Sequence, residues 1–181
     1  MMNLLFSPSG RLAPGPFMTG AIVLSVLLFV VKVLPLVSVS VAGIAGIIGL
    51  VLIYCWFALF IKRYHDAGKT GWLALIPLAI IVPLGLFVEG WVQGLVAPET
   101  VAATEALAAE AMESGGFGGL FEAGEEIQAL GAELARETAL AVAITRGLMA
   151  FSVAWLFNRF TQHDPTPNQY GAPMGEADTF E

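Results

Sequence analysis

The segment from Val39 to Ile61, VSVAGIAGIIGLVLIYCWFALFI, decides the class of this protein. Its 23 residues carry no charge, and 13 of them are Val, Ile, Leu or Phe. A helix of roughly 20 apolar residues crosses a bilayer core of about 30 Å. At about 0.3 to 0.6 kcal/mol per apolar residue, insertion of this segment is favourable by roughly 4 to 8 kcal/mol. Because lipid offers the backbone no hydrogen-bond partners, the segment is predicted to be a transmembrane helix.

Three further apolar segments bring the predicted spans to four: 17–37, 72–90 and 139–158. The third span contains Pro77 and Pro83, which membrane helices tolerate but which should kink it. The fourth span is marginal by itself, because Arg146 costs about 2.5 to 3.5 kcal/mol. Its eight Val, Ile, Leu or Phe residues contribute only roughly 2.4 to 4.8 kcal/mol. We therefore expect this span to depend on its neighbours.

The composition of the whole chain agrees with a membrane protein. Of 181 residues, 57% are hydrophobic and only 13% are charged, and the mean hydropathy is +0.78. An average soluble domain has about 25% charged residues, so a disordered chain is excluded and an ordinary soluble domain is disfavoured. The expected fold is all-α, a single polytopic membrane domain over residues 1–181.

Several functional classes are disfavoured by the same counts. A net charge of −7 disfavours a nucleic-acid-binding protein, which needs a basic face. The single cysteine, Cys55, excludes an internal disulfide and a zinc site built from cysteines. Acids, bases, nucleophiles and metal ligands do not gather in any catalytic pattern. We therefore expect a protein that is not an enzyme and that has no cofactor, metal or catalytic residues.

The basic residues outside the spans set the expected orientation. If the N-terminus is cytoplasmic, only Arg136 lies on the outer side, and five basic residues lie inside: Arg11, Lys62, Arg63, Lys69 and Arg159. Cytoplasmic loops are enriched in Lys and Arg, so both termini and the tail 159–181 are predicted to be cytoplasmic, with a tight outer turn near Ser38. The first span is too long for a typical cleaved signal peptide. The expected location is the bacterial inner (plasma) membrane, crossed several times.

Residues 91–138 form the predicted outer loop, which is rich in Ala and Glu. Between Ala97 and Glu137, nine Glu and one Arg give a charge of −8, which accounts for the acidity of the chain. Pro98 suits the first turn of a helix, and apolar residues recur at helical spacing further on. This pattern predicts two amphipathic helices joined by a glycine hinge at 114–119.

Two interpretations of the acidic loop stay open. It is either a solvated cap on the bundle or a docking surface for a partner or for cations. Scattered Glu residues without a fixed spacing make a poor calcium site, so no metal is assigned. A further hypothesis places Phe117 and Phe121, which flank the hinge, in the outer lipid surface.

Three polar segments stand out, and all are expected on the cytoplasmic side: Ser9–Leu12 (SGRL), Lys62–Trp72 (KRYHDAGKTGW) and Pro167–Gly171 (PNQYG). Together with the four spans they resemble the bacterial membrane proteins grouped as domain of unknown function 805. The resemblance covers most of the chain, and the central segment is its most specific part. It implies a small helical inner-membrane bundle and no particular activity. The motif residues are Gly10, Arg11, Lys62, Arg63, His65, Asp66, Gly71, Trp72, Asn168, Tyr170 and Gly171.

The N-terminal segment and the outer loop depart from the pattern of that family. Ala13–Pro16 stands where a second basic residue often follows in the family, and the acidic loop is longer than expected. These departures weaken any shared role for the N-terminal segment and leave the central segment intact.

The central segment has two interpretations that differ in function. As a lipid site, Lys62, Arg63 and Lys69 would reach headgroup phosphates, with Tyr64 and Trp72 as interface anchors. As a structural turn, Asp66 would accept backbone N–H bonds, and Gly68 and Gly71 would allow a tight reversal. Because all three motif segments are predicted at one face, they are expected to form one joint structure.

Three charged residues lie within the predicted spans: Lys32, Glu89 and Arg146. Lys32 is close enough to its helix end to extend its ammonium to the interface. Glu89 is expected to reach Arg146 across the bundle, either as a structural ion pair or as part of a polar pathway. The predicted function is a lipid- or partner-binding membrane module; the alternative is a small transporter or channel component. Expected partners are membrane lipids, another membrane protein or a second copy of the chain, and no nucleic acid.

Overall fold

The computed structural model describes residues 2–37 and 42–173, and the predicted turn near Ser38 and the tail beyond residue 173 lie outside them. Every long element in the described residues is a helix, which confirms the all-α prediction. The bounds are α1 Met2–Phe6, α2 Pro14–Val33, η1 Leu34–Leu36, α3 Ala42–Asp66, η3 Gly71–Ala74, α4 Leu75–Val96, α5 Pro98–Glu122 and α6 Gly124–Phe160. Four helical segments, in α2, α3, α4 and α6, are long and apolar enough to cross a membrane. The chain is therefore a multi-pass membrane protein.

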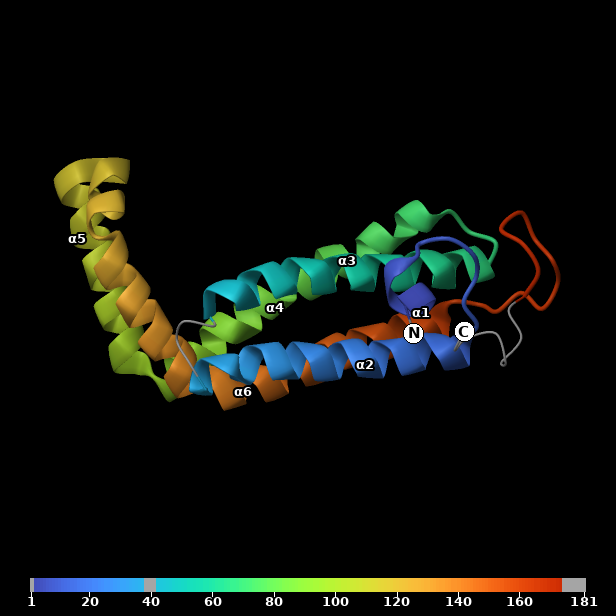
Figure 1. Ribbon diagram of the computed structural model, residues 1–181, viewed down its shortest axis with the longest axis horizontal. Helices are drawn as coiled ribbons and strands as arrows, with labels where there is room; N and C mark the ends of the chain where they lie inside the picture. Colours follow the sequence, from blue (N-terminus) through green and yellow to red (C-terminus); the bar gives the residue numbers. More distant parts are fainter. Residues whose placement is uncertain (1, 38–41, 174–181) are drawn as a thin grey trace.

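The four long helices form an elongated bundle (Figure 1). Helix α6 packs along both α2 and α4, and α3 packs on α2, whereas α3 and α4 scarcely contact each other. Ala150 and Ala154 of α6 are fully buried, and their small side chains let neighbouring helices approach closely. We call the end of the bundle with Asp66 and Phe160 the motif end, and the opposite end the hairpin end.

An aromatic layer fills the bundle near the motif end. Phe60 is its centre, with ring centroids 5.3 Å from Phe17, 5.9 Å from Trp56 and 6.1 Å from Phe157. The tilted and edge-on arrangements of Phe17 and Phe157 against Phe60 are those that aromatic quadrupoles favour. All four spans reach this end, so the layer closes the bundle core beneath the polar motif segments.

The end of α3 and the prolines of α4 are placed differently from the expected spans. Helix α3 continues five residues beyond Ile61 and ends at Asp66, so the first half of the central motif is helical. Basic side chains in the last turn suit the negative end of the helix dipole, and Arg63 and His65 occupy that turn. Helix α4 continues through Pro83, whereas Pro77 sits in its first turn, where a missing N–H is harmless.

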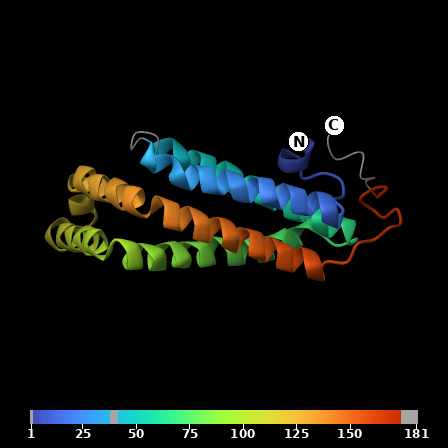
Figure 2. The same cartoon turned by 90° about the horizontal axis from the view of Figure 1, so that it is seen from below.

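The acidic segment forms a helical hairpin that turns away from the bundle axis (Figure 1). Helix α5 contains Gly116 with φ +58° and ψ −138°, a non-helical conformation that falls within the predicted glycine hinge. Helix α6 then runs without interruption for 37 residues through the second arm of the hairpin and the fourth span. At the base, Thr100 Oγ1 donates to Glu137 Oε2 at 2.8 Å. Figure 2 shows both arms of the hairpin extending beyond the hairpin end of the bundle.

Candidate functional site

The three motif segments meet at the motif end, where Asp66 is the centre of a buried polar cluster. Figure 1 shows the N-terminal segment, the end of α3 and the chain after α6 side by side there. The Asp66 side chain is fully buried and accepts from three side chains: Arg11 at 3.2 Å, Arg63 at 3.0 Å and His163 at 2.7 Å. We call these four side chains the Asp66 cluster. A carboxylate this deeply buried needs such partners, because an unpaired buried charge is very costly.

Arg11 links the N-terminal segment to the tail. It is only 1% exposed, and its Nη1 donates to the carbonyl oxygens of Thr166 at 2.6 Å and Gly171 at 3.1 Å. Its Nη2 donates to Asp66 Oδ1 and to the carbonyl of Asp164. The Nε of Arg11 is buried, and none of the described residues accepts a hydrogen bond from it. The planar guanidinium thus organises three tail carbonyls and a carboxylate at once, which an ammonium could not do with the same geometry.

Arg63 makes the corresponding link between α3 and the end of α6. It is 2% exposed, and its Nε donates to Asn158 Oδ1 at 2.6 Å. Its Nη1 bonds Asp66 Oδ2 at 3.0 Å, and its Nη2 donates to the carbonyl of Thr161. The carbonyls at the end of a helix lack intrahelical partners, and Arg63 satisfies one of them.

The tail closes over His65 through a ring stack and hydrogen bonds. Tyr170 lies flat on the imidazole, with ring centroids 3.8 Å apart and an interplanar angle of 7°. Asn168 Nδ2 donates to the His65 carbonyl at 3.1 Å, and Asn168 Oδ1 accepts from the Tyr170 N–H at 2.9 Å. Gly171 completes the turn with φ +116°, a conformation that favours glycine.

Glycines of the other two motif segments fit around the same imidazole. His65 Nδ1 donates to the Gly10 carbonyl at 3.1 Å, and Gly10 has φ +86°. A Cβ on Gly71 would lie 2.9 Å from His65 Nε2 and from Ile61, so the close approach requires glycine there. The predicted joint structure is therefore present in the geometry, and all three motif segments contribute to it.

Lys62, Arg63 and Tyr64 are buried, which contradicts the lipid-site interpretation of these side chains, one of the two given for the central segment. Lys62 Nζ donates to the carbonyls of Asn3 at 2.8 Å and Leu4 at 2.5 Å, at the end of α1. The interpretation of these three side chains as phosphate ligands or interface anchors was wrong. Lys62 and Arg63 donate to backbone carbonyls, and Tyr64 packs in the apolar core. Lys69 and Trp72 remain exposed, as an interface position requires.

The chemical capacity of the Asp66 cluster follows from these contacts. Its donors are directed at backbone carbonyls and one carboxylate, which suits a clasp between chain segments rather than a ligand site. Beside it, hydrogen bonds from the Thr166 hydroxyl and N–H hold the pKa of Asp164 below its usual value. No group of three or more His, Cys, Asp or Glu residues that could hold a metal ion occurs in residues 2–37 and 42–173.

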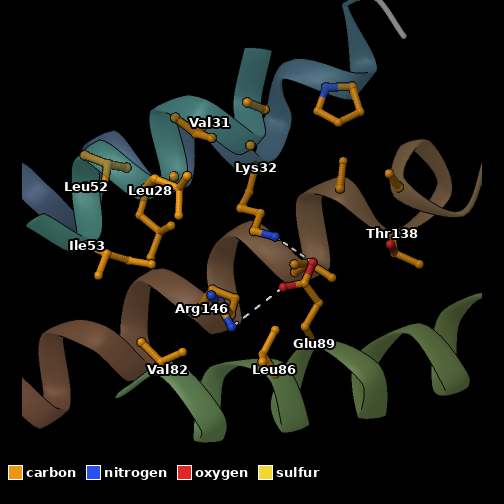
Figure 3. A pocket seen from close by; sticks show the side chains of 18 of the residues that line it. Leu28, Val31, Lys32, Leu52, Ile53, Val82, Leu86, Glu89, Thr138 and Arg146 are labelled. Carbon is orange, nitrogen blue, oxygen red and sulfur yellow. Dashed lines mark hydrogen bonds and ion pairs between the residues drawn. The ribbon is translucent and has the colours of Figure 1, made fainter. Parts of the chain in front are cut away.

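A second polar cluster lies inside the bundle and contains the three intramembrane charges (Figure 3). Lys32 Nζ lies 2.6 Å from Glu89 Oε1, and Arg146 Nη1 lies 3.7 Å from Glu89 Oε2. The expected contact between Glu89 and Arg146 is present. Lys32 does not extend to the interface as expected, because it turns inward to the same carboxylate. We call these three residues the charge triad.

The charge triad lines a cavity of about 400 Å³ in the half of the bundle towards the hairpin end. All four spans contribute to its walls, which are mostly apolar, and Trp56 of the aromatic layer is part of them. Leu50 of α3 and Leu86 of α4 line the cavity yet are 69% and 64% exposed. Because α3 and α4 scarcely touch, we infer that the cavity opens between these two side chains. Pockets of about 300 to 1,000 Å³ with apolar walls and a few polar groups are typical ligand sites.

Several residues at the Asp66 cluster, and the cavity itself, carried no signal in the sequence. His163, Thr166 and Asn158 are contacts of the Asp66 cluster, but they lie in ordinary polar context outside the motif segments. The cavity itself had no signal, since its walls are the same Leu, Ile and Val that any span contains. Gly46 and Gly49, which leave room on α3, are the one feature that could have indicated it.

Fold and sites together define a small multi-pass membrane protein whose four spans are closed at one end by a clasp of three motif segments. The chain belongs to the family described as "Protein of unknown function (DUF805)", whose model matches residues 5–172. That match runs from the last residues of α1 through the turn at Gly171, and so includes all three motif segments of the clasp. No curated protein and no solved structure is significantly similar to the chain.

Proposed function

We propose that the protein is a non-enzymatic membrane module that binds a lipid in the cavity between its four spans. The observation that carries this proposal is that Leu50 of α3 and Leu86 of α4 line the cavity and are exposed, on two helices that scarcely touch. In a bilayer, a mouth in that position opens to lipid rather than to water. A lipid can therefore enter sideways without crossing an aqueous phase.

The proposed location is the bacterial inner membrane, with the motif end in the cytoplasm. The basic residues outside the hydrophobic spans support this orientation, because cytoplasmic loops are enriched in Lys and Arg. The acidic hairpin then extends on the outer side, where the excess of Glu carries no penalty under that rule. Attachment of a membrane-impermeant reagent to a single cysteine at Lys69 or at Glu113, in a Cys55→Ala background, tests the orientation.

The Asp66 cluster is assigned a structural role in this proposal. Arg11 and Arg63 are each at most 2% exposed and donate to groups of the chain itself, so lipid phosphates have little access to them. The clasp would hold the ends of the spans together and so keep the cavity walls in position. A protein partner, either a different membrane protein or a second copy, would have to use surfaces outside the clasp.

A small transporter or channel component is the second candidate, and the charge triad is the observation that favours it. Polar groups inside the membrane often mark solute or proton pathways. Against it, Trp56 and Phe60 separate the cavity from the motif end, so a polar path would have to pass the aromatic layer. Solute uptake that depends on Glu89 or Arg146 would favour this candidate over lipid binding.

Native mass spectrometry of the gently extracted protein tests lipid binding. Gly49 lines the cavity, and a Cβ there would meet no atom within 4 Å, so Gly49→Leu projects new volume into the cavity. Gly94→Leu is the matched control, because Gly94 is equally open and does not line the cavity. We expect bound lipid on the wild type and on Gly94→Leu, and its loss from Gly49→Leu. Equal lipid retention by all three proteins, or none on the wild type, would refute the proposal.

A further inference from the structure

We infer that the lipid bound in the cavity is anionic, with its headgroup at Arg146 and Lys32 and its chains along the apolar wall towards Trp56. This inference rests on the proposed function and adds the chemical class and the orientation of the ligand. It depends on the balance of positive and negative side chains that line the cavity.

The cavity has one positive charge in excess. Its charged lining consists of Lys32, Arg146 and Glu89, so one carboxylate faces two cations. Charged side chains within the hydrocarbon region are costly unless they are paired. A ligand with one negative charge would bring the balance to zero.

Arg146 is held in the triad by a long ion pair and by no hydrogen bond among the described residues. Glu89 Oε1 forms a close hydrogen bond with Lys32 at 2.6 Å, whereas its Oε2 is 3.7 Å from Arg146, which is beyond hydrogen-bond distance. The Nε and Nη1 of Arg146 are buried and have no hydrogen-bond partner within residues 2–37 and 42–173. A guanidinium with free donors matches the paired oxygens of a phosphate or carboxylate.

The position of the triad along the bundle sets the orientation of the ligand. Arg146 precedes the end of α6 by 14 residues, or about 21 Å at 1.5 Å per residue. Lys32 is the penultimate residue of α2, so the triad lies towards the hairpin end. From there the wall towards the motif end is apolar and includes Leu28, Leu52 and Trp56. A ligand that matches both the positively charged triad and the apolar wall has a negative headgroup and hydrocarbon chains.

Competition between two lipids with identical acyl chains tests this inference. Delipidated protein is mixed with equal amounts of phosphatidylglycerol and phosphatidylcholine, and bound lipid is counted by native mass spectrometry. We expect the wild type to prefer phosphatidylglycerol roughly tenfold, the ratio that corresponds to about 1.4 kcal/mol. The preference should disappear in Arg146→Gln and in Lys32→Gln and increase in Glu89→Gln, because the last change raises the positive excess.

Two control experiments distinguish binding of an anionic lipid in the cavity from attraction to surface charge and from binding of a free anion. Arg159→Gln removes an exposed charge from α6, the helix that carries Arg146, and should keep the preference for phosphatidylglycerol. If Arg159→Gln loses the preference as fully as Arg146→Gln does, the lipid site is not in the cavity. Excess inorganic phosphate should not displace the lipid, and displacement would make a free anion the occupant. Equal binding of both lipids by the wild type overturns the anionic class and leaves lipid binding intact. No binding of either lipid overturns the proposed function itself.

Discussion

His65 and Tyr170 lie face to face with ring centroids 3.8 Å apart, although one ends a span and the other belongs to the tail. The stack fixes the tail over the end of α3, and Asn168 reinforces it by donating to the His65 carbonyl. Offset aromatic stacking contributes about 0.5 to 1.5 kcal/mol beyond the burial of area. The tail is therefore held by several modest contacts around one buried carboxylate.

Loss of the Tyr170 ring should release the tail without unfolding the bundle. We expect Tyr170→Ala to increase the rate of proteolysis between residues 161 and 173 by up to about tenfold, the factor that 1.4 kcal/mol represents. Tyr170→Phe keeps the ring and should behave like the wild type. Equal cleavage rates in Tyr170→Ala and the wild type would contradict a role for the stack.

Neutralisation of Asp66 should destabilise the whole protein. Asp66→Asn leaves Arg11 and Arg63 buried without their shared carboxylate, a change that typically costs about 3 to 5 kcal/mol. Thermal unfolding in detergent, followed by circular dichroism, measures the effect. Asp164→Asn is the control, because that carboxylate is not part of the Asp66 cluster and should shift the unfolding temperature far less. Similar shifts in both variants would contradict the central role of Asp66.

A methyl group at position 85 should displace Arg146 from its present position. A Cβ on Gly85 would collide with the guanidinium, which can move only by changing its approach to Glu89. We expect Gly85→Ala to reduce the preference for phosphatidylglycerol in the lipid competition while the unfolding temperature changes little. Gly94→Ala adds the same methyl group where nothing lies within 4 Å and should alter neither quantity. An unchanged preference in Gly85→Ala would argue against Arg146 as the headgroup ligand.

The tail should also respond to acid through Asp164. Hydrogen bonds from Thr166 to the Asp164 carboxylate lower its pKa, so the ionised form is favoured in the folded tail. The resulting stabilisation is complete above the ordinary pKa of Asp and is lost as the pH falls through the lowered value. Thr166→Ala removes the hydroxyl bond and should raise the pKa of Asp164 in a carbon-13 NMR titration. A pKa that stays the same would show that the hydroxyl does not lower it.

The hairpin tip offers a test of contact with lipid. Phe117 and Phe121 are strongly exposed there, as expected for side chains that enter the outer lipid surface. In a background in which the native tryptophans are replaced by Phe, Phe117→Trp supplies the single tryptophan. Its fluorescence should be lower in liposomes with quencher-labelled lipids than in liposomes without them. Glu105→Trp, on the same arm but away from the tip, should lose much less. Unquenched emission at position 117 would assign the hairpin to water.

Much of the architecture could be predicted because each span carries its own signal. The run from Val39 to Ile61 has no alternative to a membrane helix, and the glycine-rich break at 114–119 marks the turn of the hairpin. The distribution of basic residues also placed the three motif segments at the same end of the bundle. These predictions use local composition or spacing, which a sequence displays directly.

The direction of individual charged side chains could not be predicted. Lys62 and Arg63 look like lipid ligands in the sequence, but carbonyls of α1 and of the chain after α6 accept their hydrogen bonds. Lys32 is near enough to its helix end to reach the interface, yet Glu89 on another span is a nearer partner. In both cases the deciding partner is distant in sequence and has no motif of its own.

The clasp also constrains the timing of biosynthesis. Arg63 and its acceptor at Thr161 are separated by 98 residues, so the ribosome needs about 5 to 20 s between them at about 5 to 20 residues per second. Throughout that interval Arg63 and Asp66 at the end of α3 lack their partners from the tail, the Thr161 carbonyl and His163. A nascent chain that stalls before residue 161 therefore has Arg11 and Arg63 on Asp66 but lacks His163, and its clasp is incomplete.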